Sequence, residues 1–483
     1  MRLAPLSLAN ARHRAKTAAV RWFACCTMFA LCCTACQHVP LAPIDPAANA
    51  VRLSTRSLTD PTVRDALATR GIAAPPDNAW SLDQLTLAAW LLRTDLATAR
   101  AEVGAVRAAT GVEAQRPNPT VNFTNEKVTD SGATNPWVVG AALAMTFELG
   151  GKREIRRERA LASEAAAEWQ FGEALWSARA EVRRSWLDLS LSRELVALDT
   201  DEDTLRQGFL TWVETRLRLG AGTTPERLAA LQAANETRSR LAQDSAALAT
   251  ARAELAAAIG VASAELAALE PSPLAMLPTF AAADIATARD NALVNRLDVR
   301  RALAEYQVAE QELRAAVALQ YPDLTLAPGY LHDQADHKIT LGLDLPVPLF
   351  HNAKPAIRQA IAQRAVAAAK FDEVQAAALA AIDIGAARLT SARAAFDAAE
   401  RASTAAGDAE RSMQRRLTAG AADRGEVLTE QIALAGLKRS ALDARRALID
   451  ALTTLENGVE QPLFPASQLA PAASLRELLG SSP

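Results

Sequence analysis

The chain contains two pairs of segments in which apolar side chains alternate with small or polar ones. From Trp137 to Phe147, alternate residues form an apolar face, and the residues between them are mostly small. The same alternation returns from Ile339 to Leu345. A period of two residues is typical of β-strands. We therefore predict four strands, at about residues 119–126, 136–147, 322–331 and 338–348.

The chain outside these strands has the pattern of very long helices. No proline occurs from Gly151 to Leu219, and about 69 residues would form a helix roughly 100 Å long. Leu175, Val182 and Leu189 recur at the spacing of a coiled coil. Further helices are expected at about residues 81–116, 225–260, 291–319, 355–419 and 424–457. Two short helices together match one long helix in length, so we expect them to stack end to end along it.

The two halves of the chain repeat each other at an offset of about 200 residues. The matching anchors are Arg216–Gly220, Glu226 and Leu228 against Arg416–Gly420, Glu426 and Leu428, and Pro119–Phe123 against Pro322–Leu326. Each half therefore reads helix, two strands, long helix, tight turn, helix. The expected tips of the helical hairpins lie at about 220–225 and 420–424. The expected divisions are a first repeat at 81–260, a connector at 261–287, a second repeat at 288–460 and an extended tail at 461–483.

Strands of about ten residues with an apolar outer face are typical of a transmembrane β-barrel. The alternative is a soluble hairpin that packs on a helix. Four strands cannot close a barrel, and open strand edges are not tolerated in lipid. If the strands span a membrane, the chain must pool them with copies of itself, and a trimer would supply twelve.

The first residues predict export to the cell surface. Basic residues precede the apolar stretch Trp22–Ala35, which has the length of a signal sequence, so residues 1–35 are expected to be a signal peptide. All five cysteines precede residue 37, and Cys33-Thr-Ala-Cys36 resembles a bacterial lipobox, although the usual leucine is replaced by Cys33. Cys36 is the candidate lipidation site, and cleavage by an ordinary signal peptidase nearby is the alternative. Residues 36–80 are then a lipid-anchored extended segment, and no later apolar run is long enough to cross a membrane as a helix.

Composition narrows the function classes. Half of the residues are hydrophobic but only 5% are aromatic, so the apolar side chains are mostly small and favour helices. A net charge of −3 does not suggest a nucleic-acid-binding surface. No catalytic constellation and no nucleotide-binding glycine motif is recognisable. We therefore expect neither an enzyme nor a cofactor.

One short segment carries potential metal ligands. His332-Asp-Gln-Ala-Asp-His337 places two imidazoles and two carboxylates within six residues. It falls between the last two predicted strands, where an exposed loop outside the cell is expected. A solvated loop without metal is the preferred interpretation, so His332 and His337 are only weak candidates.

The export signal, duplicated halves, strand pairs and long helices together resemble the TolC-like outer membrane factor family. The residues that carry the resemblance are the Arg-x-x-x-Gly turns at Arg216 and Arg416 and the strand openings at Pro119 and Pro322. The segment Phe147–Arg153 looks like the heavy-metal and cation efflux (CzcC-like) branch of that family. The resemblance covers nearly the whole mature chain.

The resemblance implies a mainly α-helical fold with a small β part. Three copies would form a twelve-stranded outer membrane β-barrel continued by a twelve-helix α-barrel in the periplasm. It also implies docking of the hairpin tips to a periplasmic adaptor and to an inner membrane pump of the resistance-nodulation-division type. The tip residues are Arg216, Gly220, Gly222, Arg416 and Gly420. The two arginines could instead stabilise the helix ends through the macrodipole.

The resemblance also locates a pore constriction just beyond the second tip. Glu426 matches an acidic position of the family, and Thr429 stands where a second acidic residue often lies. Asp423 is a candidate to compensate for that missing charge. For Glu426, an ordinary solvated helix position is the alternative.

Several functions remain open at this point. A passive duct could export metal ions, drugs or organic solvents, or proteins, since its partners choose the substrate. A protein of another class, a lipid-anchored periplasmic coiled-coil interaction protein, fits the helices but leaves the alternating strands unexplained.

Overall fold

The computed structural model describes residues 38–73, 75, 79–129, 136–267, 269, 278–280, 282–334, 336–350, 352–463 and 469–479. The chain divides into two compact units, Met1–Ser54 and Thr55–Pro483. The described part of the first unit contains helix α2 (Pro46–Ser54). The expected signal peptide and the lipidation candidate Cys36 lie outside the described residues.

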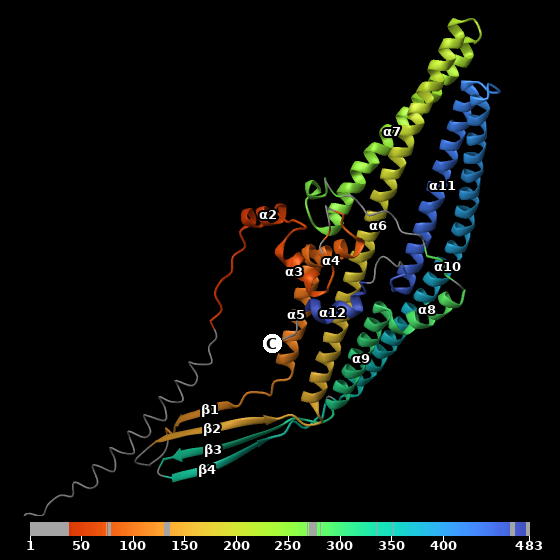
Figure 1. Cartoon of the computed structure of the whole chain (residues 1–483). Coiled ribbons are helices and arrows are strands. Elements are labelled where there is room, and N and C mark those ends of the chain that lie inside the picture. Colours follow the sequence, from red (N-terminus) through yellow and green to blue (C-terminus); the bar gives the residue numbers. More distant parts are fainter. Residues whose placement is uncertain are drawn as a thin grey trace, which may run out of the picture. The chain divides into compact units, whose positions relative to one another are not determined.

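The second unit contains an antiparallel sheet in the order β1-β2-β3-β4 (Figure 1). Its strands are β1 (Thr120–Lys127), β2 (Trp137–Phe147), β3 (Leu324–Asp333) and β4 (Asp336–Asp344). Because β2 pairs with β3, the centre of the sheet joins the two halves of the chain. The last strand ends before residue 348, since Pro346 and Pro348 have no N–H to donate to a ladder.

The two faces of the sheet differ in chemistry. The register places Phe123, Ala141, Tyr330 and Ile339 in one row across the four strands. On this apolar face Phe123 is 80% exposed and Ile339 is 92% exposed. The opposite face is small and polar, and at Gly140 a Cβ would lie only 2.9 Å from the carbonyl oxygen of Tyr330. The predicted alternation is therefore present, and the single chain leaves its apolar face uncovered.

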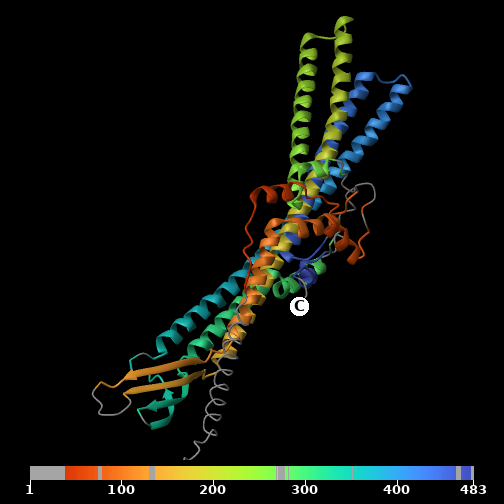
Figure 2. The ribbon, with the colours of Figure 1, turned by 90° about the vertical axis from the view of Figure 1, so that its left-hand side faces the viewer.

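Two long helical hairpins lead away from the sheet (Figures 1 and 2). The first consists of α6 (Lys152–Arg218) and α7 (Thr224–Ile259), and the second of α10 (Lys354–Thr418) and α11 (Arg424–Val459). Nearer the sheet, α5 (Thr94–Glu113) packs on α6 and α9 (Leu297–Ala318) packs on α10. Each long helix thus has two shorter partners in succession, as their lengths predict. The prediction of a mainly α-helical fold with four strands is confirmed.

The short helices are broken where the sequence analysis predicts continuous ones. The expected helix 81–116 is α4 (Leu82–Leu92) and α5, separated by Arg93, which is extended with φ −67° and ψ 133°. The Arg93 guanidinium binds both Asp95 oxygens, at 3.0 and 2.7 Å, and the carbonyl of Ala258 at 3.1 Å. Those contacts tie the break to the end of α7, which local sequence patterns do not encode.

The second repeat has the same break. Helix α8 (Ala282–Asn295) is separated from α9 by Arg296, whereas an unbroken helix is predicted from about residue 291. The Arg296 guanidinium binds both oxygens of Asp298, at 3.0 and 2.7 Å, and the carbonyl of Gly458 at the end of α11. The duplicated arginine is therefore a structural feature of both repeats.

The segments expected to be extended contain helices. Helix α3 (Pro61–Thr69) follows α2, begins with a proline and is capped by Asp60, and it buries Val63 and Leu67. The tail contains α12 (Pro471–Leu479), in which Leu475 is 6% exposed and lies against Gly172 of α6. The connector includes the 3-10 turn Ser263–Leu266 and the start of α8. In α3 and α12, burial of a few leucines and a valine outweighs the proline content of these segments.

The main core lies where α4 and α7 pack on the middle of α6. Trp90 is 1% exposed, and its indole N–H donates to the carbonyl of Leu175 at 3.0 Å. The expected coiled-coil positions Leu175, Val182 and Leu189 are all buried. Between α10 and α11, a Cβ on Gly385 would lie 2.9 Å from the Cα of Leu455, so small residues allow the close helix approach. Among the described residues, no helix has the length and apolarity needed to cross a membrane.

Candidate functional site at the helical hairpin tips

Each hairpin reverses at a glycine with a left-handed backbone. Gly220 has φ +74° and Gly420 has φ +71°. In both turns the N–H of the next residue, Ala221 or Ala421, donates to a carbonyl five residues earlier at 2.8 Å. Such a turn closes a helix C-terminus and favours glycine, because a side chain is strained at positive φ. The backbone conformation of the two turns therefore favours glycine at the predicted tip positions Gly220 and Gly420.

The tip arginines close the same turns. The Nη2 of Arg216 donates to the carbonyl of Ala221 at 2.8 Å, and the Nη2 of Arg416 donates to the carbonyl of Ala421 at 3.3 Å. At Gly222, a Cβ would lie 3.0 Å from the backbone nitrogen of Leu217, so the first turn has little room there. These contacts account for the repeated Arg-x-x-x-Gly pattern. A docking role for the same residues stays a prediction.

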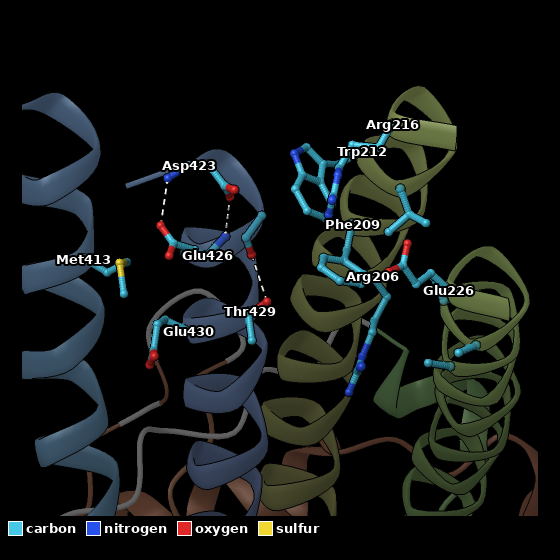
Figure 3. A pocket seen from close by; sticks show the side chains of 15 residues that line it. Arg206, Phe209, Trp212, Arg216, Glu226, Met413, Asp423, Glu426, Thr429 and Glu430 are labelled. Carbon is cyan, nitrogen blue, oxygen red and sulfur yellow. Dashed lines mark hydrogen bonds between the residues drawn. The ribbon is translucent and has the colours of Figure 1, made fainter. Parts of the chain in front are cut away.

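The returning helices both begin with a capping box. In α11 the N–H of Asp423 donates to Glu426 Oε2 at 2.9 Å, and the N–H of Glu426 donates to Asp423 Oδ1 at 2.9 Å (Figure 3). In α7, Thr223 and Glu226 make the same pair of bonds, at 2.9 and 3.4 Å. The repeated glutamate is therefore a helix-capping residue in both hairpins. The spacing of Thr or Asp three residues before Glu is the sequence signal that would have identified it.

The predicted constriction residues lie together on the first turns of α11. Glu426 and Thr429 are exposed, and the hydroxyl of Thr429 donates to the carbonyl of Gly425 at 2.8 Å. The cap uses Oε2 of Glu426, which accepts the hydrogen bond from the N–H of Asp423. The side chain of Asp423 is also exposed, and it is held in place by the hydrogen bond that its Oδ1 accepts from the N–H of Glu426.

The first hairpin contacts the second through a tryptophan. A Cβ added to Gly425 would lie 2.3 Å from the ring of Trp212, so the indole packs directly on the backbone of α11. The same ring stacks on Phe209 with centroids 5.6 Å apart, and the Arg216 guanidinium lies 4.7 Å from its centroid. This contact leaves no signal in the local sequence, because it joins residues about 200 positions apart.

These groups line a pocket of about 760 Å³ between the hairpins. Its walls carry four carboxylates, two arginines, aromatic rings and small side chains (Figure 3). The charged residues are Glu226, Asp423, Glu426, Glu430, Arg206 and Arg216. Three of the four carboxylates, Glu226, Asp423 and Glu426, belong to the capping boxes, and the pocket offers polar contacts and negative charge.

Below the tips a charge network ties the two hairpins together. Arg439 of α11 pairs with Asp199 of α6 and, at 3.0 Å, with Asp244 of α7. The side chain of Asp199 is fully buried, and burial raises the pKa of this carboxyl. Arg240 of α7 also approaches Asp199, at 3.5 Å. The network therefore links α6 and α7 of the first hairpin to α11 of the second.

The weak metal candidates lie in strands rather than in a loop. His332 of β3 and His337 of β4 are direct cross-strand partners, with ring centroids 4.8 Å apart. The Nδ1 of His337 is hydrogen-bonded to the hydroxyl of Tyr330. Asp333 and Asp336 form the neighbouring pair, and their side chains alternate to the opposite face. Within the described ranges, no group of three or more His, Cys, Asp or Glu residues is placed to hold a metal.

The sequence matches a known family across both repeats. Residues 88–261 and 288–458 match the family of outer membrane efflux proteins, which together is well over half of the chain. No curated protein matches the sequence.

Several solved structures share the fold. The outer membrane protein VceC from Vibrio cholerae superposes with a TM-score of 0.64 at 19% identity, covering 78% of this chain and 95% of VceC. The open-state outer membrane channel MtrE of Neisseria gonorrhoeae superposes with a TM-score of 0.62 at 18% identity, covering 78% of this chain and 88% of MtrE. The outer membrane channel CmeC of Campylobacter jejuni superposes with a TM-score of 0.62 at 13% identity, covering 92% of this chain and 97% of CmeC. With the family match over both repeats, this chain belongs to the outer membrane efflux protein family.

Proposed function

We propose that the protein is the outer membrane channel of a tripartite efflux system. The observation that carries the proposal is the sheet: four strands with an exposed apolar face and two edges, β1 and β4, at which this chain supplies no further strand among the described residues. In lipid such edges must be paired. Three copies would supply twelve strands and close a barrel, with the helices extending into the periplasm. Cys36 would add a lipid anchor.

The opposite face of the sheet suits the lumen of such a barrel. Glycine, alanine and threonine alternate there with charged residues, including Lys338 and Asp344. Lys338 pairs with Asp333 at 2.5 Å near the β3–β4 turn. A polar, small-residue interior is typical of water-filled membrane barrels. The duct would be passive, and energy would come from its partners.

The hairpin tips are the proposed docking points for a periplasmic adaptor and an inner membrane pump of the resistance-nodulation-division type. Leu219 is 78% exposed beside Gly220 at the first tip. The turn is closed by the hydrogen bond from Arg216 to the carbonyl of Ala221, and in this proposal Leu219 is its apolar contact with another protein. In this proposal Gly220, Gly222, Arg416 and Gly420 shape the docking turns.

The constriction is proposed at Asp423, Glu426 and Thr429. Around a threefold axis, the exposed carboxylates of the first two residues would form rings of negative charge. Such rings attract cations and repel anions at a pore mouth. Since Glu426 and Asp423 also cap α11, the same residues would combine a structural and a selective role.

Heavy-metal cations are the substrate class we favour, on the basis of the CzcC-like segment Phe147–Arg153 and the acidic tip. Drugs or organic solvents, or proteins, are the alternative cargoes. A periplasmic interaction protein without a channel would leave the exposed apolar strands without a role.

An efflux assay in the native host tests this proposal. A deletion strain should become sensitive to heavy-metal cations and accumulate them, and the wild-type gene should restore export. A shift in sensitivity to drugs alone would move the substrate class to the drug alternative. No change with metals, drugs or secreted proteins would count against a role in efflux. As a partner test, the purified protein should co-purify with an adaptor, and replacing Leu219 with Asp should weaken that association.

A further inference from the structure

A second pocket lies where the sheet joins the first long helix. It has a volume of about 640 Å³ and is lined by the segment before β1, the end of β2 and the start of α6. Pro117, Pro119, Met145 and Phe147 supply apolar walls, and Arg116 and Arg153 supply positive charge. Met145 and Phe147 belong to the apolar face of the sheet, so the pocket is continuous with that face.

The positive charge of this pocket is uncompensated. Its one carboxylate, Glu148, is already held by Arg156, whose Nη2 donates to Oε2 at 3.1 Å. Arg153 donates its Nε to the carbonyl of Ala114 at 2.7 Å. Among the described residues, neither Arg153 nor Arg116 forms an ion pair with a carboxylate.

The neighbouring cations are neutralised, in contrast. Lys152 pairs with Asp323 at 2.7 Å, and Arg157 pairs with Glu154 at 2.9 Å. The surplus charge is therefore concentrated on the two guanidiniums that line the pocket. An exposed guanidinium can donate two parallel hydrogen bonds to the oxygens of a phosphate, which strengthens and orients binding.

The fold does not require these arginines. Aligning the start of β1 with that of β3, and the start of α6 with that of α10, places Gln320 and Pro355 of the second repeat at the positions of Arg116 and Arg153. The second junction is built without either charge, although its strands and helix follow the same plan. A need particular to the first junction would explain the difference.

We infer that this pocket binds the phosphate headgroup of an anionic phospholipid. The inference rests on the proposed insertion of the sheet into the outer membrane. An acyl chain would then lie along the apolar face past Phe147, which is 46% exposed, and the phosphate would lie at the level of Arg116 and Arg153. The sheet-to-helix junction would sit at the inner leaflet of the membrane, and the bound lipid would fix its depth.

Native mass spectrometry of the detergent-purified protein, incubated with phosphatidylglycerol or phosphatidylcholine, tests the inference. The wild type should retain phosphatidylglycerol in preference, and the preference should weaken with salt. Each of R116Q and R153Q should reduce that retention by about fivefold, the contribution of one cation near an anionic surface. The matched control R157Q removes a neighbouring arginine that is already paired with Glu154 and should change retention little.

Three results would overturn the inference. One is equal retention by R116Q, R153Q and R157Q. Another is full displacement of the lipid by inorganic phosphate alone, which would make the pocket a site for free anions. The third is loss of the oligomer in R116Q or R153Q, which would assign the arginines to a contact with a second copy. Conductance measured on the same wild-type sample separates the two proposals: a conducting protein without lipid preference fails only this inference.

Discussion

At the scale of single residues, the ends of the two returning helices differ between the repeats. The residue after α7 is Gly260, with φ +89°, whereas the residue after α11 is Glu460, with φ +49°. Glu460 accepts a hydrogen bond from the N–H of Leu297 at 2.7 Å and lies 3.8 Å from Arg296. Burial raises the pKa of Glu460 to about 7, although the charge of Arg296 opposes this shift. The second repeat thus holds a buried acid where the first holds a glycine.

This carboxyl should make stability depend on pH. Its pKa is higher in the folded state than the ordinary value of 4.5, so the folded protein binds the proton more tightly. The contribution of Glu460 to the free energy of unfolding is fully present below pH 4.5 and is lost as pH rises through about 7. The free energy of unfolding falls in this window by at most about 1.4 kcal/mol per pH unit. Replacing Glu460 with Gln should flatten the dependence of Tm on pH in this window. An unchanged profile would assign the dependence to other groups.

Trp212 and Gly425 provide a second residue-scale prediction. A methyl group on Gly425 would overlap the indole, so G425A should cost about 1–3 kcal/mol and loosen the tips. The matched control is G436A, on the same helix, where a Cβ would meet nothing within 4 Å. That substitution should leave stability unchanged or raise it by about 0.5–1 kcal/mol. Hydrogen exchange of residues 206–216 checks the prediction, and equal exchange in the two variants would contradict it.

At the scale of elements, sequence patterns predict the four strands and the long helices, because their periodicities extend over many residues. They fail at Arg93 and Arg296, where the breaks depend on carbonyls at the ends of distant helices. They also fail at α3 and α12, which are short and are held by a few buried side chains. The turns at the hairpin tips can be predicted from the sequence. The Trp212 contact and the Arg439 network are tertiary interactions and leave no local signal in it.

Two substitutions of Asp423 distinguish its role as the cap of α11 from the role of its charge at the proposed constriction. Asn is as good a helix cap as Asp, so D423N should keep the first turn of α11 intact while removing one charge per copy. D423A should remove both the cap and the charge, and should destabilise the start of α11 by about 0.5–2 kcal/mol. Faster hydrogen exchange at residues 424–428 is expected in D423A alone. Reduced cation selectivity of the channel is expected in both variants, and full selectivity in D423N would remove Asp423 from the constriction.

At the scale of the whole molecule, buried charges join segments that the sequence places far apart. Glu456 of α11 pairs with Arg179 and Arg183 of α6, and all three side chains are fully buried. Burial lowers the pKa of Arg183 to about 10, while Glu456 opposes that shift. The duplication and fold class follow from the sequence, but this link between the repeats does not.

Removing the carboxylate should therefore be costly. E456Q would remove the carboxylate that two buried guanidiniums contact, and we expect a loss of about 3–5 kcal/mol. The control E154Q removes a carboxylate that is 55% exposed and pairs with Arg157, which is 50% exposed, so its cost should stay below about 1 kcal/mol. Thermal unfolding of the two variants provides the comparison. Equal losses would show that the buried cluster is not a major stabilising contact.

The most direct test of the central claim is the conductance of the purified protein in planar lipid bilayers. We expect a trimer extracted from the outer membrane to produce discrete, cation-selective conductance steps. L341R, which places a charge on the apolar face, should insert far less often, whereas T340R, its neighbour on the opposite face, should insert and shift selectivity toward anions. A trimer from that membrane that gives no conductance would contradict the account.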